Sequence, residues 1–203
     1  SYMRVTTADE LEKYSNDDNY NVTSVTEARL NYLQLNPGGV FATLPDEARE
    51  AVMLALNDQE IIDAAYGSDK LATVANSVLT PDQSLYNKKA PGYSQNIEKA
   101  KELAESSGLA GKTLKYIYNA DRANMEAVAT VVQQQLAAIG VNLEVQGMDS
   151  PTFFSIFFLP YSGKTTDEYD LGSNGWDSER GDCGWQASTY MKNTGWGWSE
   201  EMT

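Results

Sequence analysis

The clearest hydrophobic pattern in the chain lies between Gly111 and Gln146, where the period of the apolar positions changes twice. Thr113 to Tyr118 and Val141 to Gln146 are rich in β-forming residues with alternating character, which is typical of strands. Between them, apolar side chains recur at the spacing of one helix face, namely Met125, Val128, Val132, Leu136 and Ile139. The pattern predicts a strand, a helix and a second strand.

The residues around this helix indicate where it begins and ends. Asn119 and Asp121 offer side-chain oxygens to the first N–H groups of a helix, and Gly140 suits the left-handed residue that ends one. Two strands joined by a single helix are normally parallel, with a right-handed crossover. We therefore expect an α/β fold, a mixed sheet flanked by helices.

Helical patterns also occur on both sides of this unit. We expect helices at Thr7–Lys13 (capped by Thr6 or Thr7), after Pro45, at Gln59–Tyr66, at Ile97–Ser106 (capped by Asn96), and in the aromatic stretch that follows Asp149-Ser150-Pro151. Two strands are expected at Val22–Val25 and Arg29–Leu35, and a brief one after Tyr169-Asp170-Leu171. Leu71–Tyr86 shows no period and is expected to form an extended surface loop.

Charge and composition exclude several classes of function. The chain has 15 Lys plus Arg against 29 Asp plus Glu, a formal net charge of -14, which opposes binding to nucleic acid and to anionic membranes. It contains no His, which excludes Ser-His-Asp and Cys-His catalysis and His-based metal sites. The single Cys183 cannot form an intramolecular disulfide.

The length of the chain suits one sizeable core. We interpret residues 1–203 as a single α/β lobe. Because the chain starts at Ser1 and stops after Thr203 without any evident signal, we expect a fragment of a larger protein with arbitrary ends.

An ordered set of motifs resembles one protein family. Leu33-Gln34-Leu35-Asn36 followed by Phe41, the paired helices around Ala48–Val52 and Leu56–Ile62, and Glu98–Leu103 before Gly108 all match its pattern. The run Gln133-Gln134-Gln135-Leu136 with Ile139-Gly140-Val141, then Tyr169-Asp170-Leu171 with Gly175-Trp176, completes the set. In these features the chain resembles the extracytoplasmic solute-binding proteins of peptide and nickel ABC importers, the oligopeptide- and dipeptide-binding type.

This resemblance implies a two-lobed protein that closes on a peptide, with this chain as much of the distal lobe of a type II periplasmic-binding-protein-like fold. In the family, an acid three residues after the Trp often pairs with the peptide ammonium. Here that residue is Glu179 rather than Asp, and Asp182-Cys183 replaces the family's Asp-Pro. A carboxylate in an aromatic pocket is a sensible ammonium receptor, so we expect Glu179, Trp176, Asp177, Asp182 and Trp185 to line the ligand site.

Other interpretations of these residues stay open. Asp177, Glu179 and Asp182 could hold Ca²⁺ or Mg²⁺, although their spacing does not match an EF-hand loop, or could form a glycosidase carboxylate pair. Four Trp and twelve Tyr would also suit an oligosaccharide ligand. Trp196 and Trp198 could stack on a ligand, or they could be apolar residues that the missing half of the protein covers.

The resemblance as a whole favours binding without catalysis. It implies a peptide ligand, an ABC importer permease as the membrane partner, no cofactor and a monomer. It also implies an extracytoplasmic location, either lipid-anchored at the outer face of the cell membrane or periplasmic.

Overall fold

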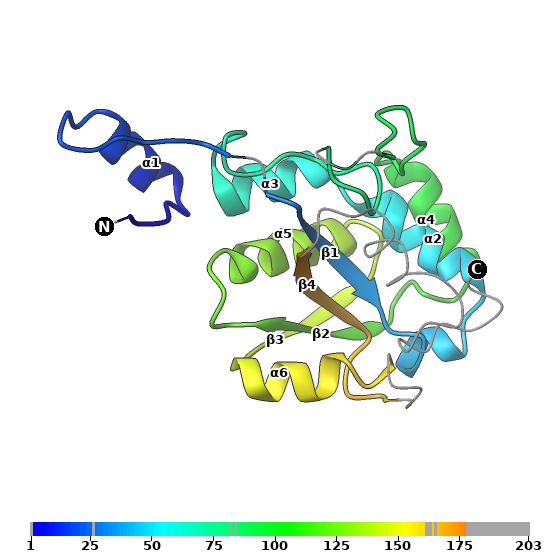
Figure 1. Cartoon of the computed structure of the whole chain (residues 1–203). Helices are drawn as coiled ribbons and strands as arrows, with labels where there is room; N and C mark the ends of the chain where they lie inside the picture. Colours follow the sequence, from blue (N-terminus) through cyan, green and yellow to red (C-terminus); the bar gives the residue numbers. More distant parts are fainter. Residues whose placement is uncertain are drawn as a thin grey trace.

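Within the residues that the structure describes, four strands and the helices around them make up the fold (Figure 1). The computed structural model describes residues 2–25, 27–81, 83, 85–160, 164 and 166–177. Along the chain the elements are α1 (Ala8–Ser15), β1 (Arg29–Leu35), the 3₁₀ turn η1 (Gly39–Ala42), α2 (Asp46–Ala55), α3 (Asp58–Tyr66), α4 (Ile97–Ser106), β2 (Thr113–Asn119), α5 (Met125–Ala137), β3 (Asn142–Met148), α6 (Ser150–Phe157) and β4 (Leu171–Asp177).

The sheet is mixed, in the order β1-β4-β2-β3. β2 is parallel to both β3 and β4, whereas β1 is antiparallel to β4. Helix α5, which joins β2 to β3, lies on one face of the sheet, and α6, which leads from β3 toward β4, lies on the other (Figure 1). The predicted strand–helix–strand unit and the α/β fold class are therefore confirmed.

Each face of the sheet has its own buried cluster. On the α5 face, residues of α2, α4 and α5 pack against β2 and β3 in a core that includes Phe41, Val52, Leu103, Leu114 and Leu136. On the α6 face, Phe153, Phe157 and Tyr169 pack against Ile117. The ring centroids of Phe157 and Tyr169 lie 5.8 Å apart in a stacked arrangement. The aromatic run after Pro151 thus forms a helix because its rings cover the second face of the sheet.

The predicted beginning of α5 is wrong, whereas its predicted end is confirmed. The N-cap of α5 is Asn124, which adopts a left-handed φ of 72°. The Asn119 side chain instead accepts a hydrogen bond from the Asp121 N–H at 3.0 Å, so it stabilises the turn that precedes the helix. At the other end Gly140 has a φ of +77°, and the Val141 N–H bonds to the Leu136 carbonyl, which is the expected left-handed termination.

The flanking helices follow the sequence pattern closely. The Thr7, Asn57, Asn96 and Asp149 side chains each accept an N–H from the first turn of the helix that follows. The strand predicted at Val22–Val25 is wrong, because residues 21–25 are irregular and both valines are exposed. A strand needs a pairing partner, and no described strand pairs with this segment.

No helix within the described ranges has both the length and the apolar character required to span a membrane.

Candidate functional site

The last residues of β4 extend beyond the strand next to them. Pairing between β4 and β2 stops at Tyr118 and Ser173, whereas pairing between β4 and β1 continues to Arg29 and Asp177. From Asn174 onward, β4 therefore pairs with a strand on one side only, as far as the described residues go. Binding sites in α/β sheets commonly form at the carboxyl ends of parallel strands, where the connecting segments leave room for a ligand.

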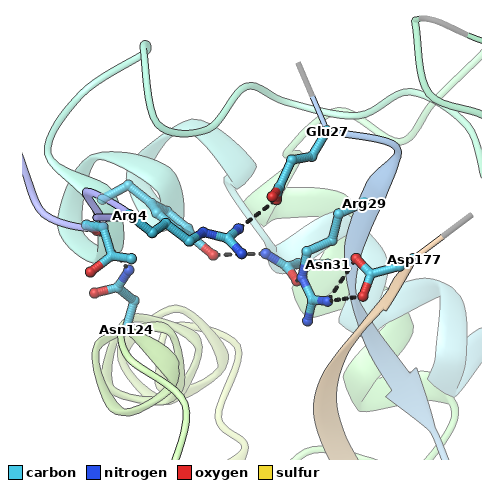
Figure 2. Close-up of polar contacts among 8 residues, drawn as sticks. Arg4, Glu27, Arg29, Asn31, Asn124 and Asp177 are labelled. Carbon is cyan, nitrogen blue, oxygen red and sulfur yellow. Dashed lines mark hydrogen bonds and ion pairs between the residues drawn. The ribbon is translucent and has the colours of Figure 1, made fainter. Parts of the chain in front are cut away.

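An ion pair closes the β1 side of this strand end (Figure 2). Nη1 of Arg29 donates to both carboxylate oxygens of Asp177, at 2.9 and 2.7 Å. The Arg29 side chain is mostly buried, at 16% exposure, whereas the Asp177 side chain is 61% exposed. The Arg29 Nε also donates to Asn31 Oδ1, and Asn31 donates to the Tyr66 hydroxyl at 2.7 Å. Burial has the largest effect on the pKa of Tyr66, and it raises that pKa.

Gly175 makes this arrangement possible. A Cβ atom at position 175 would overlap the Arg29 guanidinium and the Asn31 side-chain oxygen. The glycine of the Gly-Trp motif thus provides the space that the Arg29 guanidinium occupies while it pairs with Asp177.

The N-terminal segment lies against the same region (Figure 2). Arg4 pairs with Glu27 at 2.6 Å, just before β1, and the Asn124 side-chain amide donates to the Thr6 carbonyl at 3.5 Å. The segment therefore spans from the beginning of α5 to the beginning of β1.

A cavity of about 220 Å³ lies at the same strand end. Its lining residues come from β4, α6 and the loop after β2: Arg122, Phe154, Phe158, Asn174, Gly175, Trp176 and Asp177. The Phe154 and Phe158 rings stack with centroids 5.4 Å apart, and Phe158 meets the Trp176 ring edge-on at 6.5 Å. The cavity thus has an aromatic wall.

Two polar groups of the cavity lack a hydrogen-bond or ion-pair partner among the described residues. Asn174 is 2% exposed, and its side-chain oxygen has no hydrogen-bond partner among the described residues. Arg122 forms no ion pair within the described part of the chain. Partial desolvation, and then the charge of Arg29, lower the pKa of Arg122, while Asp177 raises it. A buried polar atom without a partner is costly, so an unpaired oxygen beside a cavity points to a ligand.

Hydrogen bonds hold the loop that carries Arg122. The Asn119 amide exchanges two hydrogen bonds with the Ser150 hydroxyl, at 3.0 and 3.1 Å. The Ser150 N–H, at the start of α6, donates to the Asp121 carboxylate at 2.8 Å, and the Arg122 N–H donates to the Asn119 carbonyl at 3.2 Å. The loop is therefore bound both to the end of β2 and to the beginning of α6.

Two of the five residues expected to line the ligand site are among the described residues. Trp176 and Asp177 both line the cavity, and the Asp177 carboxylate is paired with Arg29. Glu179, Asp182 and Trp185 lie outside the described residues, as do Cys183, Trp196 and Trp198. Among the described residues, no group of three or more Cys, Asp or Glu is arranged to hold a metal ion.

Sequence reasoning missed four residues of the cavity: Arg122, Phe154, Phe158 and Asn174. The only signal for Asn174 was its position two residues before Trp176, within the brief strand predicted after Tyr169-Asp170-Leu171. The Phe154 and Phe158 side chains belong to a run that predicted a helix, and nothing in that run separates rings that pack on the sheet from rings that line a cavity.

The described residues thus form an α/β fold, with a mixed sheet, helices on both of its faces and a cavity at the carboxyl end of one strand. The family profile described as bacterial extracellular solute-binding proteins, family 5 Middle, matches residues 1–198. The chain belongs to this family.

Individual relatives agree with this assignment. The substrate-binding protein CtaP of an ABC transporter from Listeria monocytogenes is 30% identical, with a TM-score of 0.77 over 89% of this chain and 37% of that chain. The AppA protein from Clostridium difficile, provisionally named a peptide-binding protein, is also 30% identical, with a TM-score of 0.78 over 94% of this chain and 38% of that one. These similarities confirm the type II periplasmic-binding-protein-like fold.

A curated relative from Brucella ovis, provisionally named an ABC transporter peptide-binding protein, is 28% identical over 170 residues, or 81% of this chain. The chain spans 31% of the length of that relative. Its span of 37% and 38% of the two solved proteins is similar. The sequence therefore corresponds to about a third of the length of these relatives.

Proposed function

We propose that the full-length protein captures peptides outside the cytoplasm and delivers them to the membrane permease of an ABC importer. It binds by closure of two lobes and carries out no chemistry, and the present chain supplies one of the two lobes. The observation that carries this proposal is the cavity beside Trp176, with an aromatic wall and a buried unpaired Asn174 oxygen, in a chain of the solute-binding family.

Peptide is the ligand class that the relatives favour. The Clostridium difficile and Brucella ovis relatives both carry peptide binding in their names. A binder of varied peptides obtains general affinity from main-chain hydrogen bonds and uses pockets for the side chains. We propose that the cavity of about 220 Å³ serves as one such side-chain pocket.

Glu179 is the proposed partner of the peptide ammonium group, with Asp182 and Trp185 beside it. The Asp177 carboxylate already has a cationic partner in Arg29. An ammonium group that leaves water needs an anion of its own, and Glu179 is the next carboxylate along the chain.

The proposal includes a location and partners. The family is extracellular, and we propose that the protein is either lipid-anchored at the outer face of the membrane or free in the periplasm. It acts as a monomer that meets its permease while loaded with ligand. Its net charge of -14 supports a role that involves no nucleic acid.

A thermal-shift screen of the full-length protein tests the ligand class. The panel holds di- to hexapeptides, oligosaccharides and divalent metal salts. A ligand at a hundred times its Kd stabilises the native state by about 2.7 kcal/mol, so even a modest binder raises Tm. We expect peptides alone to raise Tm. A rise with oligosaccharides and none with peptides would retain the fold and overturn the ligand class.

Glu179→Gln tests the ammonium site in the same protein. We expect this variant to bind peptides with a free N-terminus about 10- to 100-fold more weakly, because a charge-assisted pair is lost. N-acetylated peptides, which have no ammonium group, should bind both proteins alike. Glu105→Gln, on the exposed side of α4, is the control for loss of one negative charge. An equal loss for free and acetylated peptides would assign Glu179 a structural role instead.

A further inference from the structure

The N-terminal segment, residues 2–25, carries a concentration of exposed apolar side chains. Five of the ten large hydrophobic side chains that are exposed among the described residues belong to it, namely Tyr2, Met3, Tyr20, Val22 and Val25. No residue of α1 is buried, and none of residues 2–25 belongs to either buried cluster of the sheet. Single apolar side chains at a surface are normal, but such a concentration in one short segment indicates an interaction surface.

The segment nevertheless has local structure of its own. The Thr7 side chain accepts the Glu10 N–H at 3.3 Å, and the Glu10 carboxylate accepts the Thr6 N–H at 3.2 Å, so the first turn of α1 is capped. The Tyr14 and Tyr20 rings lie 4.7 Å apart, which brings the turn after α1 back onto the helix. Because a helix of eight residues is marginal in water on its own, α1 requires packing against other elements.

The described part of this chain supplies little of that packing. The ion pair between Arg4 and Glu27 is exposed on both sides, and exposed pairs add little to stability. The Asn124 amide reaches the segment with a hydrogen bond of 3.5 Å, at the outer limit for such a bond, and Ala8 approaches the end of α3 at Gly67. Figure 1 shows α1 at the periphery, outside the helices that cover the two faces of the sheet. The apolar surface of the segment is therefore expected to contact another part of the protein.

The path of the chain indicates which part that is. Arg29, the first residue of β1, lies opposite Asp177, the last residue of β4. The chain thus enters and leaves the sheet side by side, and the N-terminal segment directly precedes this point. The sequence corresponds to about a third of the length of its relatives. A second lobe joined through these two strand ends would lie next to residues 2–25.

We propose that residues 2–25 dock against an apolar face of the second lobe, with Tyr2, Val22 and Val25 among the contacting side chains. The segment then packs with the second lobe, and the lobe described above begins at β1. Since both partners belong to one chain, their effective concentration is high and a small apolar surface is sufficient. This inference rests on the proposed function, which supplies the second lobe.

Thiol labelling of the full-length protein tests the docking. Val25→Cys places a thiol in the segment, and Leu85→Cys is the matched control, because the two native side chains are 77% and 70% exposed in this structure. Both variants are made in a background in which the native cysteines, Cys183 included, are replaced by serine. Each variant is labelled with a maleimide in buffer and in urea, and its two rates are compared.

We expect Val25→Cys to react at least about 10-fold more slowly in buffer than in urea, because its thiol is covered unless the segment detaches. Leu85→Cys should react in buffer within about threefold of its rate in urea. The protection at position 25 should persist when the protein is diluted about 100-fold, because contacts within one chain do not depend on concentration. Equal rates for Val25→Cys in buffer and in urea would overturn the docking. Protection that disappears on dilution would assign the surface to a second copy of the protein and would overturn it too.

A photo-cross-linker at position 2 identifies the partner and does not depend on the cysteine variants. Benzoylphenylalanine in place of Tyr2 keeps an aromatic side chain at a fully exposed position, so the fold and the proposed contact are retained. We expect mass spectrometry of the irradiated full-length protein to find cross-links from position 2 to residues outside Ser1–Thr203. Cross-links confined to residues 27–177, or cross-links that join two molecules, would show that the second lobe is not the partner.

These results separate the docking from the proposed function. If peptides raise the Tm of the full-length protein but Val25→Cys is labelled freely, the protein is a peptide carrier and the docking is wrong. If no peptide binds while position 2 cross-links to residues beyond this chain, the docking is supported and the proposed ligand class is wrong.

Discussion

Asp170, just before β4, is buried at 3% exposure and links three parts of the fold. Its carboxylate accepts the Val40 N–H at 2.7 Å and the Lys115 N–H at 2.8 Å, and its own backbone bonds to both Lys115 and Asn36. A carboxylate can accept both N–H groups, one at each oxygen. The turn after β1 and the strand β2 are thereby joined to the beginning of β4.

Asp170→Asn should destabilise the protein for this reason. An asparagine offers one acceptor oxygen, so its NH₂ group would face one of the two N–H donors. We expect the free energy of unfolding to fall by about 1–3 kcal/mol, the cost of a buried group left without its bond. Urea unfolding measures the change, with Asp167→Asn at a nearby exposed position as the control. A loss no greater than that of the control would show that Asp170 does not join these segments.

The buried hydroxyl of Tyr169 should make the stability of the protein depend on pH in the alkaline range. Its hydroxyl donates to the Phe157 carbonyl at 3.0 Å and accepts from Gln34, and burial raises its pKa above the ordinary value. The folded state therefore holds this proton more tightly than the unfolded state does. The contribution is complete below pH about 10, the pKa of an unfolded tyrosine, and is lost as the pH rises above it.

Tyr169→Phe isolates the contribution of the Tyr169 hydroxyl to the pH dependence of stability. The variant should be less stable at neutral pH, because Gln34 and the Phe157 carbonyl lose a partner. Between pH 9 and pH 11, however, its free energy of unfolding should fall less steeply than that of wild type, by up to about 1.4 kcal/mol per pH unit above pH 10. Urea titrations across this range measure the slopes, with Tyr20→Phe at an exposed position as the control. Parallel slopes would contradict the assignment.

At the scale of elements, the β1–β4 pair depends on a glycine. Gly175→Ala would place a methyl group where the Arg29 guanidinium lies, so the ion pair with Asp177 should break. We expect a loss of about 1–3 kcal/mol from overpacking. Gly92→Ala is the matched control, because a Cβ atom at position 92 meets nothing within 4 Å. Urea unfolding of the two variants decides the matter, and equal stabilities would show that Arg29 moves aside without cost.

The elements that sequence could predict are those specified by local chemistry. Asn57 and Asn96 cap α3 and α4 as expected, because a cap needs only its own side chain and the next three residues. The strand expected at Val22–Val25 failed because a strand depends on a partner far away in the chain. The N-cap of α5 was misplaced because Asn119 bonds to Ser150, a contact that sequence spacing does not reveal.

The candidate site was predictable only in part for the same reason. Trp176 was identified through a family motif, and the structure places it in the cavity wall. Arg122 and Asn174 lie 52 positions apart in the sequence and share the cavity only because β4 extends beyond β2. Asp177 was expected to face ligand, but its pairing with Arg29 depends on the register of two antiparallel strands. Register of this kind is a property of the folded sheet.

At the scale of the whole molecule, two features have opposite consequences for the chain on its own: one favours folding, and the other limits ligand binding. Both faces of its sheet are covered by helices and have buried clusters, which is what independent folding requires. Its cavity, by contrast, is proposed to belong to one of two lobes, and the sequence corresponds to about a third of the length of the relatives that it matches. Closure of two lobes would bring further contacts to a ligand held at Trp176.

The 203-residue chain expressed alone should therefore fold but bind poorly. We expect a cooperative urea transition, and peptide binding at least about 100-fold weaker than that of the full-length protein, because a second set of contacts worth about 2.7 kcal/mol or more is missing. Circular dichroism follows the unfolding, and calorimetry with the same peptide compares the two proteins. A non-cooperative transition would contradict the claim of an independent core. Micromolar peptide binding by the chain itself would show that one lobe holds the ligand and that closure serves delivery to the permease.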